Sequence, residues 1–384
     1  MADVRLGIVG LGSMGAQHAR ALVDGAIAGA TLVAVCDSDP SRLEAFPLVA
    51  RFASCDDLLA SGQVDALVVA TPHYDHVPLG VAALEAGVHV LVEKPLAVHV
   101  ADGQQLLDAH DRRPDLVLGF MANQRTDPRY RFLKQLLDQG ELGAVHRISW
   151  TITDWFRTDA YYASSSWRAT WAGEGGGVLI NQCPHQLDLL CWLFGTPSRV
   201  RGFCQLGKWH DLEVEDACTA YLEFPGGATG VFVTTTGEAP GVNRLEVATD
   251  RGRVVVEEDV RWTRTTPSVT EQLRTAPGAF DLPALEELTY SFEGWGGQHH
   301  EVLANFVAAV AHGGALIGPG VEGLAAVECA NAILMSSLWD RTLDLPLDRQ
   351  AVAEEFRHLA ASGRPAPTSQ QTGILDLSDS FGHH

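Results

Sequence analysis

The sequence predicts a two-domain α/β protein. We expect an N-terminal Rossmann domain with a doubly wound parallel sheet, then an α+β domain with a large, mostly antiparallel open sheet. Three observations lead there: 384 residues exceed one ordinary domain, strands alternate with helices up to residue 120, and strand follows strand after it. We assign cofactor binding to residues 1–121 and substrate binding and oligomerisation to 122–361, and we expect a flexible tail over 362–384.

The first third of the chain alternates between apolar strands and helical patterns. Such alternation predicts βαβ units and a parallel sheet, whose ligands bind at the carboxyl ends of its strands. The predicted strands span residues 4–9, 31–36, 65–71, 88–93 and 115–120, and the predicted helices follow the first strand and span 77–86 and 98–110.

A glycine-rich turn joins the first strand to the first helix. The segment Gly10-Leu11-Gly12-Ser13-Met14-Gly15 has the G-x-G-x-x-G spacing that allows a tight turn, close approach of a pyrophosphate and close helix packing. Asp37 ends the next strand, 22 residues beyond Gly15. Its carboxylate can accept both ribose hydroxyls and would repel a 2′-phosphate, so we expect NAD, with NADP disfavoured.

The second part of the chain is rich in strands. A run of strands after βαβ units is typical of an α+β domain with an antiparallel sheet. We predict a helix over 130–139, strands over 144–156, 217–224 and 228–236, a hairpin over 245–257 that turns at 250–252, and helices over 300–312, 321–340 and 351–361.

Composition excludes several classes of protein. With 27 Lys and Arg against 48 Asp and Glu, the net charge is −21, which disfavours nucleic acids and membrane surfaces as partners. No run of 18 apolar residues suggests a membrane span. Seven Cys without a C-x-x-C pair indicate free thiols in a reducing cytoplasm. Cys183 and His185 have no third ligand at a plausible spacing, so we assign no metal.

Three blocks resemble a known family. Thr71-Pro72 with His76, the triplet Glu93-Lys94-Pro95, and the segment GEGGGVLINQCPHQLDLLCWLFG over 173–195 are similar to signatures of the Gfo/Idh/MocA oxidoreductases. This family includes glucose–fructose oxidoreductase and inositol dehydrogenase. The resemblance extends from residue 5 to about residue 347.

The resemblance implies a dehydrogenase site. It implies that Lys94 is catalytic, that the Lys94–Pro95 bond is often cis, and that the open sheet face forms a homodimer or homotetramer. It also implies that Trp167-Arg168 reaches the nicotinamide side of the cofactor. Together with the glycine-rich turn, it places the cofactor against Gly10, Leu11, Gly12, Ser13, Met14, Gly15, Asp37, Ser38, Thr71, Pro72, His73, His76, Glu93, Lys94, Asn123, Trp167 and Arg168.

Asn181 and His185 form the second half of the expected catalytic centre. Pro184 is tolerated only in a first helical turn, so we expect a helix from about residue 182, with Asn181 and His185 on one side of its start. A His at the positive end of a helix tends to be neutral and suits a base. Many family members carry Asp at the position of Asn181. An amide there can only orient His185. Family members with Asn at this position resemble those that oxidise a sugar C3 hydroxyl, so Asn181 favours a C3 hydroxyl as the reacting group.

Aromatic and charged residues over 154–171 suit a sugar. Aromatic rings stack on apolar sugar faces, while carboxylates and guanidinium groups bond hydroxyls. The expected substrate-binding residues are Lys94, Asp154, Arg157, Tyr161, Tyr162, Asn181, His185 and His299.

We therefore hypothesise NAD-dependent oxidation of a secondary hydroxyl on a sugar, cyclitol or glycoside. His185 takes the hydroxyl proton and Lys94 stabilises the developing alkoxide. The acidic composition adds a cationic amino sugar as a candidate substrate. Three alternatives stay open: tightly bound NAD used for sugar–sugar transhydrogenation or redox-assisted glycoside cleavage, a non-catalytic NAD-binding regulator, and an imine or biliverdin-type reductase.

Overall fold

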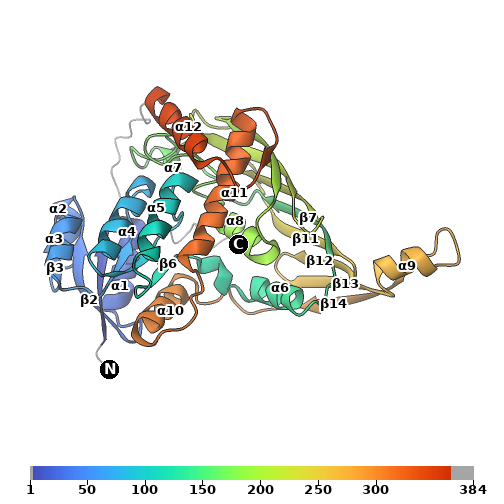
Figure 1. The fold of residues 1–384 in the computed structure, drawn as a ribbon, viewed down its shortest axis with the longest axis horizontal. Helices are drawn as coiled ribbons and strands as arrows, with labels where there is room; N and C mark the ends of the chain where they lie inside the picture. Colours follow the sequence, from blue (N-terminus) through green and yellow to red (C-terminus); the bar gives the residue numbers. More distant parts are fainter. Residues whose placement is uncertain (1–2, 365–384) are drawn as a thin grey trace.

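The computed structural model describes residues 3–364. Its first sheet has six parallel strands in the order β3-β2-β1-β4-β5-β6 (Figure 1). This confirms the predicted Rossmann domain. The strands are β1 (Val4–Val9), β2 (Ala30–Cys36), β3 (Ala50–Phe52), β4 (Ala66–Val69), β5 (His89–Val92) and β6 (Leu118–Phe120), and the helices between them are α1 (Ser13–Val23), α2 (Pro40–Leu43), α3 (Cys55–Ala60), α4 (His76–Glu85) and α5 (Val100–Asp111).

The parallel sheet is buried on both faces, which explains its nearly continuous apolar strands. All four residues of β4 are buried. One of the covering helices comes from the far end of the chain: α10 (Gln298–His312) packs Leu303 and Phe306 into the same core cluster as Leu6 and Ile8 of β1. Helix α10 therefore packs in the first domain, although we placed its residues in the second.

The second sheet has nine strands in the order β14-β13-β12-β11-β7-β10-β9-β8-β15. The pair β7–β10 is parallel and the other pairs are antiparallel, in agreement with the predicted mostly antiparallel sheet. The strands are β7 (Val145–Ile152), β8 (Arg199–Leu206), β9 (Glu215–Glu223), β10 (Thr229–Thr235), β11 (Asn243–Thr249), β12 (Gly252–Val256), β13 (Val260–Thr266), β14 (Ala284–Tyr290) and β15 (Leu343–Asp344).

Helices cover one face of this sheet, while α9 projects from the far edge (Figure 1). The covering helices bury the sheet's apolar residues, whereas Phe203, Tyr221 and Val231 on β8, β9 and β10 stay exposed. The remaining elements are the short helices η1 (His73–Asp75) and η2 (Asn123–Thr126), α6 (Pro128–Asp138), α7 (Asp159–Tyr162), α8 (Pro184–Phe194), α9 (Val269–Thr275), α11 (Gly320–Leu338) and α12 (Arg349–Ser362).

The end of the described chain contains the apolar helix α11 and the last helix, α12. By length and composition, α11 is long and apolar enough to cross a membrane. Because polar residues interrupt its apolar run, the sequence pattern does not indicate a membrane span. In its most apolar segment, 67% is buried inside the protein, as is typical of a core helix. Of the predicted tail over 362–384, Ser362 ends α12, and residues 365–384 lie outside the described residues.

Candidate active site

The glycine-rich turn has the shape that a dinucleotide requires. A Cβ on Gly10, at φ +87°, would lie 2.6 Å from the Ala70 carbonyl oxygen, and a Cβ on Gly15 would lie 1.8 Å from that of Gly10. A Cβ on Gly12 would meet nothing within 4 Å, and no side chain caps α1 at Gly12. Gly10 and Gly15 therefore serve the turn and the helix packing, and open space faces the N-terminus of α1, where a pyrophosphate fits.

Asp37 is fixed beside this turn. Its Oδ2 accepts a hydrogen bond from the Leu11 N–H at 2.6 Å, and its Oδ1 accepts one from the Asp39 N–H at 2.8 Å. Arg42 Nη1 lies 3.4 Å from Asp37 Oδ2, and Ser38 next to it is exposed. A carboxylate and a cation thus share the edge of the sheet where we expect the adenosine ribose, and we had not considered Arg42.

His76 contacts the backbone of both turns that follow β4 and β5. Its Nδ1 lies 2.7 Å from the Pro95 carbonyl oxygen and its Nε2 lies 2.9 Å from that of Thr71. Burial lowers the pKa of His76. Thr71 Oγ1 is buried without a hydrogen-bond partner among the described residues, which leaves it for a ligand.

Glu93, the residue before Lys94, is a buried carboxylate. His18 Nε2 of α1 lies 2.7 Å from Glu93 Oε1, and the Lys94 N–H donates to Glu93 Oε2 at 3.1 Å. Burial opposes ionisation of Glu93, but the contact with His18 and the charges of His299 and Lys94 together outweigh it and lower the pKa of Glu93 to about 2. His299 packs its ring 5.8 Å from that of His18, and burial lowers the pKa of His299 to about 4.

Lys94 extends from the end of β5 toward the second domain. Its ammonium donates a hydrogen bond to the Asn181 carbonyl oxygen at 2.8 Å, and the Lys94–Pro95 bond is cis. Burial lowers the pKa of Lys94 to about 8. The side chain is therefore mostly protonated at pH 7 and loses its proton slightly above it.

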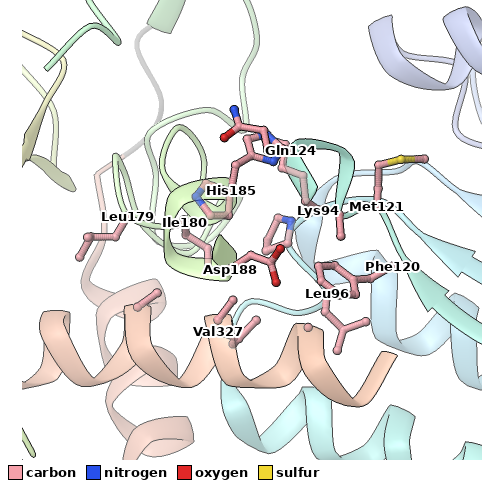
Figure 2. A pocket seen from close by; sticks show the side chains of 16 residues that line it. Lys94, Leu96, Phe120, Met121, Gln124, Leu179, Ile180, His185, Asp188 and Val327 are labelled. Carbon is pink, nitrogen blue, oxygen red and sulfur yellow. The ribbon is translucent and has the colours of Figure 1, made fainter. Parts of the chain in front are cut away.

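His185 faces the same space from α8. The helix begins at Pro184 with Cys183 as its N-cap, two residues later than we expected. Lys94 and His185 line one internal cavity of about 20 Å³ (Figure 2), room for about one water molecule. Burial and the Lys94 charge lower the pKa of His185 well below its usual value. The imidazole is therefore neutral at pH 7 and can accept a proton.

Asn181 contacts a residue that we did not single out from the sequence. Its Nδ2 donates to Glu174 Oε1 and lies 3.4 Å from the Tyr161 hydroxyl. Among the described residues, the Asn181 amide has no hydrogen bond to His185, so the expected orienting contact is not formed. Glu174 is almost fully buried, and its carboxylate also accepts the Ala169 N–H at 2.7 Å. The only sequence signal for Glu174 is its place directly before three glycines.

Tyr161 gathers the polar side chains of the substrate side. Its hydroxyl accepts hydrogen bonds from Arg168 Nη1 at 2.8 Å and Gln182 Nε2 at 3.3 Å. The Arg157 guanidinium lies 5.0 Å from the centre of the Tyr161 ring. Arg157 and Arg168 both lower the pKa of Lys94, after the larger effect of burial. Three cations therefore converge here, which argues against the cationic amino sugar that the net charge suggested.

The other predicted residues divide between the site and the core. Trp167 packs against the edge of the His73 ring at 5.5 Å, and His73 Nδ1 lies 3.0 Å from the Glu174 carbonyl oxygen. Asn123 Nδ2 donates to Gln298 at 2.8 Å. Tyr162 is buried and donates to Thr236 Oγ1 at 2.9 Å, which makes it a core residue. Asp154 is half-buried just beyond β7.

Two family models match this chain. Residues 4–119 match an oxidoreductase family with an NAD-binding Rossmann fold, and residues 130–255 match the GFO/IDH/MocA C-terminal domain. An inositol 2-dehydrogenase of Leifsonia xyli subsp. xyli is 32% identical over 200 residues, 51% of this chain and 55% of that protein. The matched part is thus about half the length of that relative. An inositol 2-dehydrogenase of Rhizobium meliloti is 26% identical over 89% of this chain and 99% of its own.

Solved structures extend the likeness over most of the chain. The WlbA dehydrogenase from Bordetella pertussis, in complex with NADH and UDP-GlcNAcA, has a TM-score of 0.74 and 27% identity, and the match covers 90% of this chain and 100% of that one. A levoglucosan dehydrogenase in complex with NADH and levoglucosan has a TM-score of 0.75 and 20% identity, with 90% and 100% covered, and so shares the fold.

Proposed function

The chain belongs to the Gfo/Idh/MocA family of oxidoreductases, and we propose that it is an NAD-dependent dehydrogenase. It oxidises a secondary hydroxyl of a sugar, cyclitol or glycoside, with the C3 hydroxyl as the first candidate. One observation carries the proposal: a neutral imidazole and a protonated lysine face one cavity at the carboxyl ends of the Rossmann strands.

His185 and Lys94 have different roles at the hydroxyl oxygen. The nicotinamide, when bound, supplies the hydride acceptor. His185 is uncharged at neutral pH and takes the hydroxyl proton, while the Lys94 ammonium donates a hydrogen bond to the same oxygen and stabilises the negative charge that develops there. Asn181 holds the ammonium through its carbonyl oxygen at 2.8 Å, and the nearby Glu93 carboxylate favours the protonated form of Lys94.

Cofactor choice rests on Asp37. The open space at Gly12, at the N-terminus of α1, suits the pyrophosphate of either dinucleotide. The buried Asp37 carboxylate favours ribose hydroxyls over a 2′-phosphate, so NAD is the proposed cofactor. Arg42 Nη1, 3.4 Å from Asp37 Oδ2, would attract a 2′-phosphate. The preference for NAD therefore requires that the Asp37 charge outweigh the Arg42 charge.

The charge of the site favours an anionic substrate. Lys94, Arg157 and Arg168 outnumber the carboxylates Glu93 and Glu174 that act on Lys94, and Glu93 already contacts His18. The relative that binds UDP-GlcNAcA supports a sugar that carries an acid group. A uronic acid should therefore have a higher kcat/KM than the matched neutral sugar, and the matched amino sugar the lowest, with the differences reduced by salt. The opposite order would reject this assignment.

A screen tests the proposed function. Sugars, uronic acids, inositols and glycosides are incubated with NAD⁺ or NADP⁺, and reduced nicotinamide is followed by absorbance. We expect NADH to accumulate with at least one secondary alcohol. If substrate is converted without net NADH, the cofactor stays bound and transhydrogenation or redox-assisted cleavage replaces this proposal. If nothing is converted although NAD⁺ binds, a regulator replaces it.

The cysteines and the exposed sheet face bear on the location and assembly of the protein. The seven cysteines are free thiols, as suits the cytoplasm. Phe203, Tyr221 and Val231 are exposed on three neighbouring strands of the second sheet, and Tyr221 and Val231 face each other in register. We define these three residues as the open-face patch. A second copy of the chain covers this patch in a homodimer or homotetramer.

A further inference from the structure

Glu174 is a buried carboxylate next to the catalytic lysine, and the proton-transfer step proposed above does not use it. Its side chain is 1% exposed. One carboxylate oxygen accepts the Ala169 N–H, and the other accepts the Asn181 side-chain amide. Arg168 Nη1 lies 3.9 Å from the second oxygen. A buried carboxylate with these contacts is well suited to act on its neighbours through its charge.

Asn181 connects this carboxylate to Lys94. The Asn181 side chain donates to Glu174, and the Asn181 carbonyl oxygen accepts the Lys94 ammonium at 2.8 Å. One residue therefore touches both charged groups from opposite ends. Because the side chain is held by Glu174, the carbonyl that positions the lysine is held as well.

The charges around Lys94 give Glu174 a second effect. Burial lowers the pKa of Lys94, and the two carboxylates Glu93 and Glu174 raise it. Burial raises the pKa of Glu174 to about 7. The charge of Glu174 therefore changes in the range where the enzyme works. The other titratable or charged groups that interact with Lys94 or Glu174 are Arg157, Arg168, His73, His185, Tyr162, Glu215 and His299.

We propose that Glu174 is a positioning residue that acts through Asn181: it fixes the carbonyl that holds Lys94 and supplies the negative charge that keeps this lysine protonated during turnover. This inference rests on the proposed dehydrogenase function. Glu174 does not touch the reacting hydroxyl, so its effect appears in the pH dependence of Lys94.

A purely structural role is the rival explanation. Glu174 also holds the Ala169 N–H, and Ala169 has a φ of +50°, so the carboxylate could serve the loop alone. Loss of a structural contact would lower activity at every pH. Loss of a charge that supports Lys94 would lower it only where Glu174 is ionised in the wild type.

The variant Glu174→Gln distinguishes the proposed effect on Lys94 from a purely structural role. At pH 6 the wild-type carboxyl is neutral, so the variant should keep kcat/KM within about twofold; at pH 8.5 it should lose about tenfold, because Lys94 gives up its proton at lower pH. KM for NAD⁺ should not change. Equal losses at both pH values, or no loss at either, would overturn the proposal.

An exchange of the two side chains is the second arm. When Glu174→Gln is combined with Asn181→Asp, the introduced amide can accept from the Ala169 N–H and donate to the introduced carboxylate. The negative charge then moves to the other side of the same hydrogen bond, and the double variant should regain most of the activity at pH 8.5. Glu213→Gln is the control, a half-buried carboxylate that accepts the Trp171 N–H of the same loop at 2.7 Å; it should leave the pH profile of kcat/KM unchanged.

A third arm works without turnover. The chain has three lysines, Lys94, Lys134 and Lys208, so labelling with acetic anhydride across pH, read by mass spectrometry, reports the pKa of each amine. Glu174→Gln should lower the pKa of Lys94 and leave Lys134 and Lys208 as references. An unchanged Lys94 titration would reject the inference even if the dehydrogenase activity is found. A shifted titration in a protein that oxidises no alcohol would reject the proposed function instead.

Discussion

At the scale of single residues, burial lowers the pKa of both side chains proposed for catalysis. Burial lowers the pKa of Lys94 to about 8 and that of His185 well below its usual value. Both environments disfavour charge, yet at pH 7 they leave the lysine protonated and the histidine neutral. This is the pairing that oxidation of a hydroxyl requires.

The pH profile follows from these shifts. Activity needs neutral His185 and protonated Lys94, so kcat/KM for alcohol oxidation should be flat near neutrality and fall as pH rises through about 8. Initial rates from pH 5.5 to 9.5 at saturating NAD⁺ measure it. A rate that instead rises through pH 8 would make the neutral lysine the base.

Asp37 should decide between the two dinucleotides. Asp37→Asn keeps an acceptor for the Leu11 N–H but removes the charge, which leaves Arg42 to attract a 2′-phosphate. We expect the ratio of kcat/KM for NAD⁺ to that for NADP⁺ to fall by about tenfold or more. Asp56→Asn, at an exposed site on α3, is the control. A wild type that prefers NADP⁺ would contradict the role of Asp37.

At the scale of elements, a buried ion pair sets the position of α8. Arg125 of η2 donates to both carboxylate oxygens of Asp188, at 2.8 and 2.6 Å, and also contacts Glu322 of α11. Asp188 lies one turn beyond His185, so this pair holds the helix that presents the base.

Removal of Arg125 should therefore destabilise the protein. Arg125→Ala leaves the Asp188 carboxylate buried and unpaired, and we expect unfolding in urea to require about 3–5 kcal/mol less free energy. Arg131→Ala removes an exposed ion pair with Glu301 and should change it by about 1 kcal/mol or less. Similar losses for both variants would show that the Arg125–Asp188 pair has no special role in holding α8.

The elements also show what a sequence can reveal. Five of the six Rossmann strands, all except the three-residue β3, and the helices α4, α5, α6 and α11 were predicted to within a few residues from their apolar patterns. The partner of Asn181 could not be predicted in this way, because the i, i+4 rule applies inside a helix and Asn181 precedes the start of α8 at Pro184. His18 meets Glu93 from a segment distant in the chain, and Glu174 meets Ala169 and Asn181 outside any helix or strand. No periodic pattern predicts either set of contacts.

At the scale of the whole molecule, the two domains share the proposed catalytic centre. The first contributes Lys94 and the second contributes His185 and Asn181, while α10 returns from the end of the chain to cover the Rossmann sheet. In the packing, α10 lies with the first domain although it follows the second sheet in the chain. Catalysis therefore depends on both domains.

The open-face patch should govern assembly. The wild type should sediment as a dimer or tetramer, and Tyr221→Lys with Val231→Lys should give monomers, because two charges then face the partner copy. Val23→Lys changes an apolar residue on α1 that is also exposed and should leave the assembly intact. Sedimentation velocity measures it, and a monomeric wild type would rule the patch out as an interface.

The most direct measurement is turnover after removal of each of the two facing side chains. Lys94→Ala and His185→Ala should each lower kcat by about 10²- to 10⁴-fold, while the Kd for NAD⁺ stays near that of the wild type. Lys134→Ala and His312→Ala, at sites outside the centre, should turn over normally. Near-normal turnover by either active-site variant would contradict the paired roles of the lysine and the histidine.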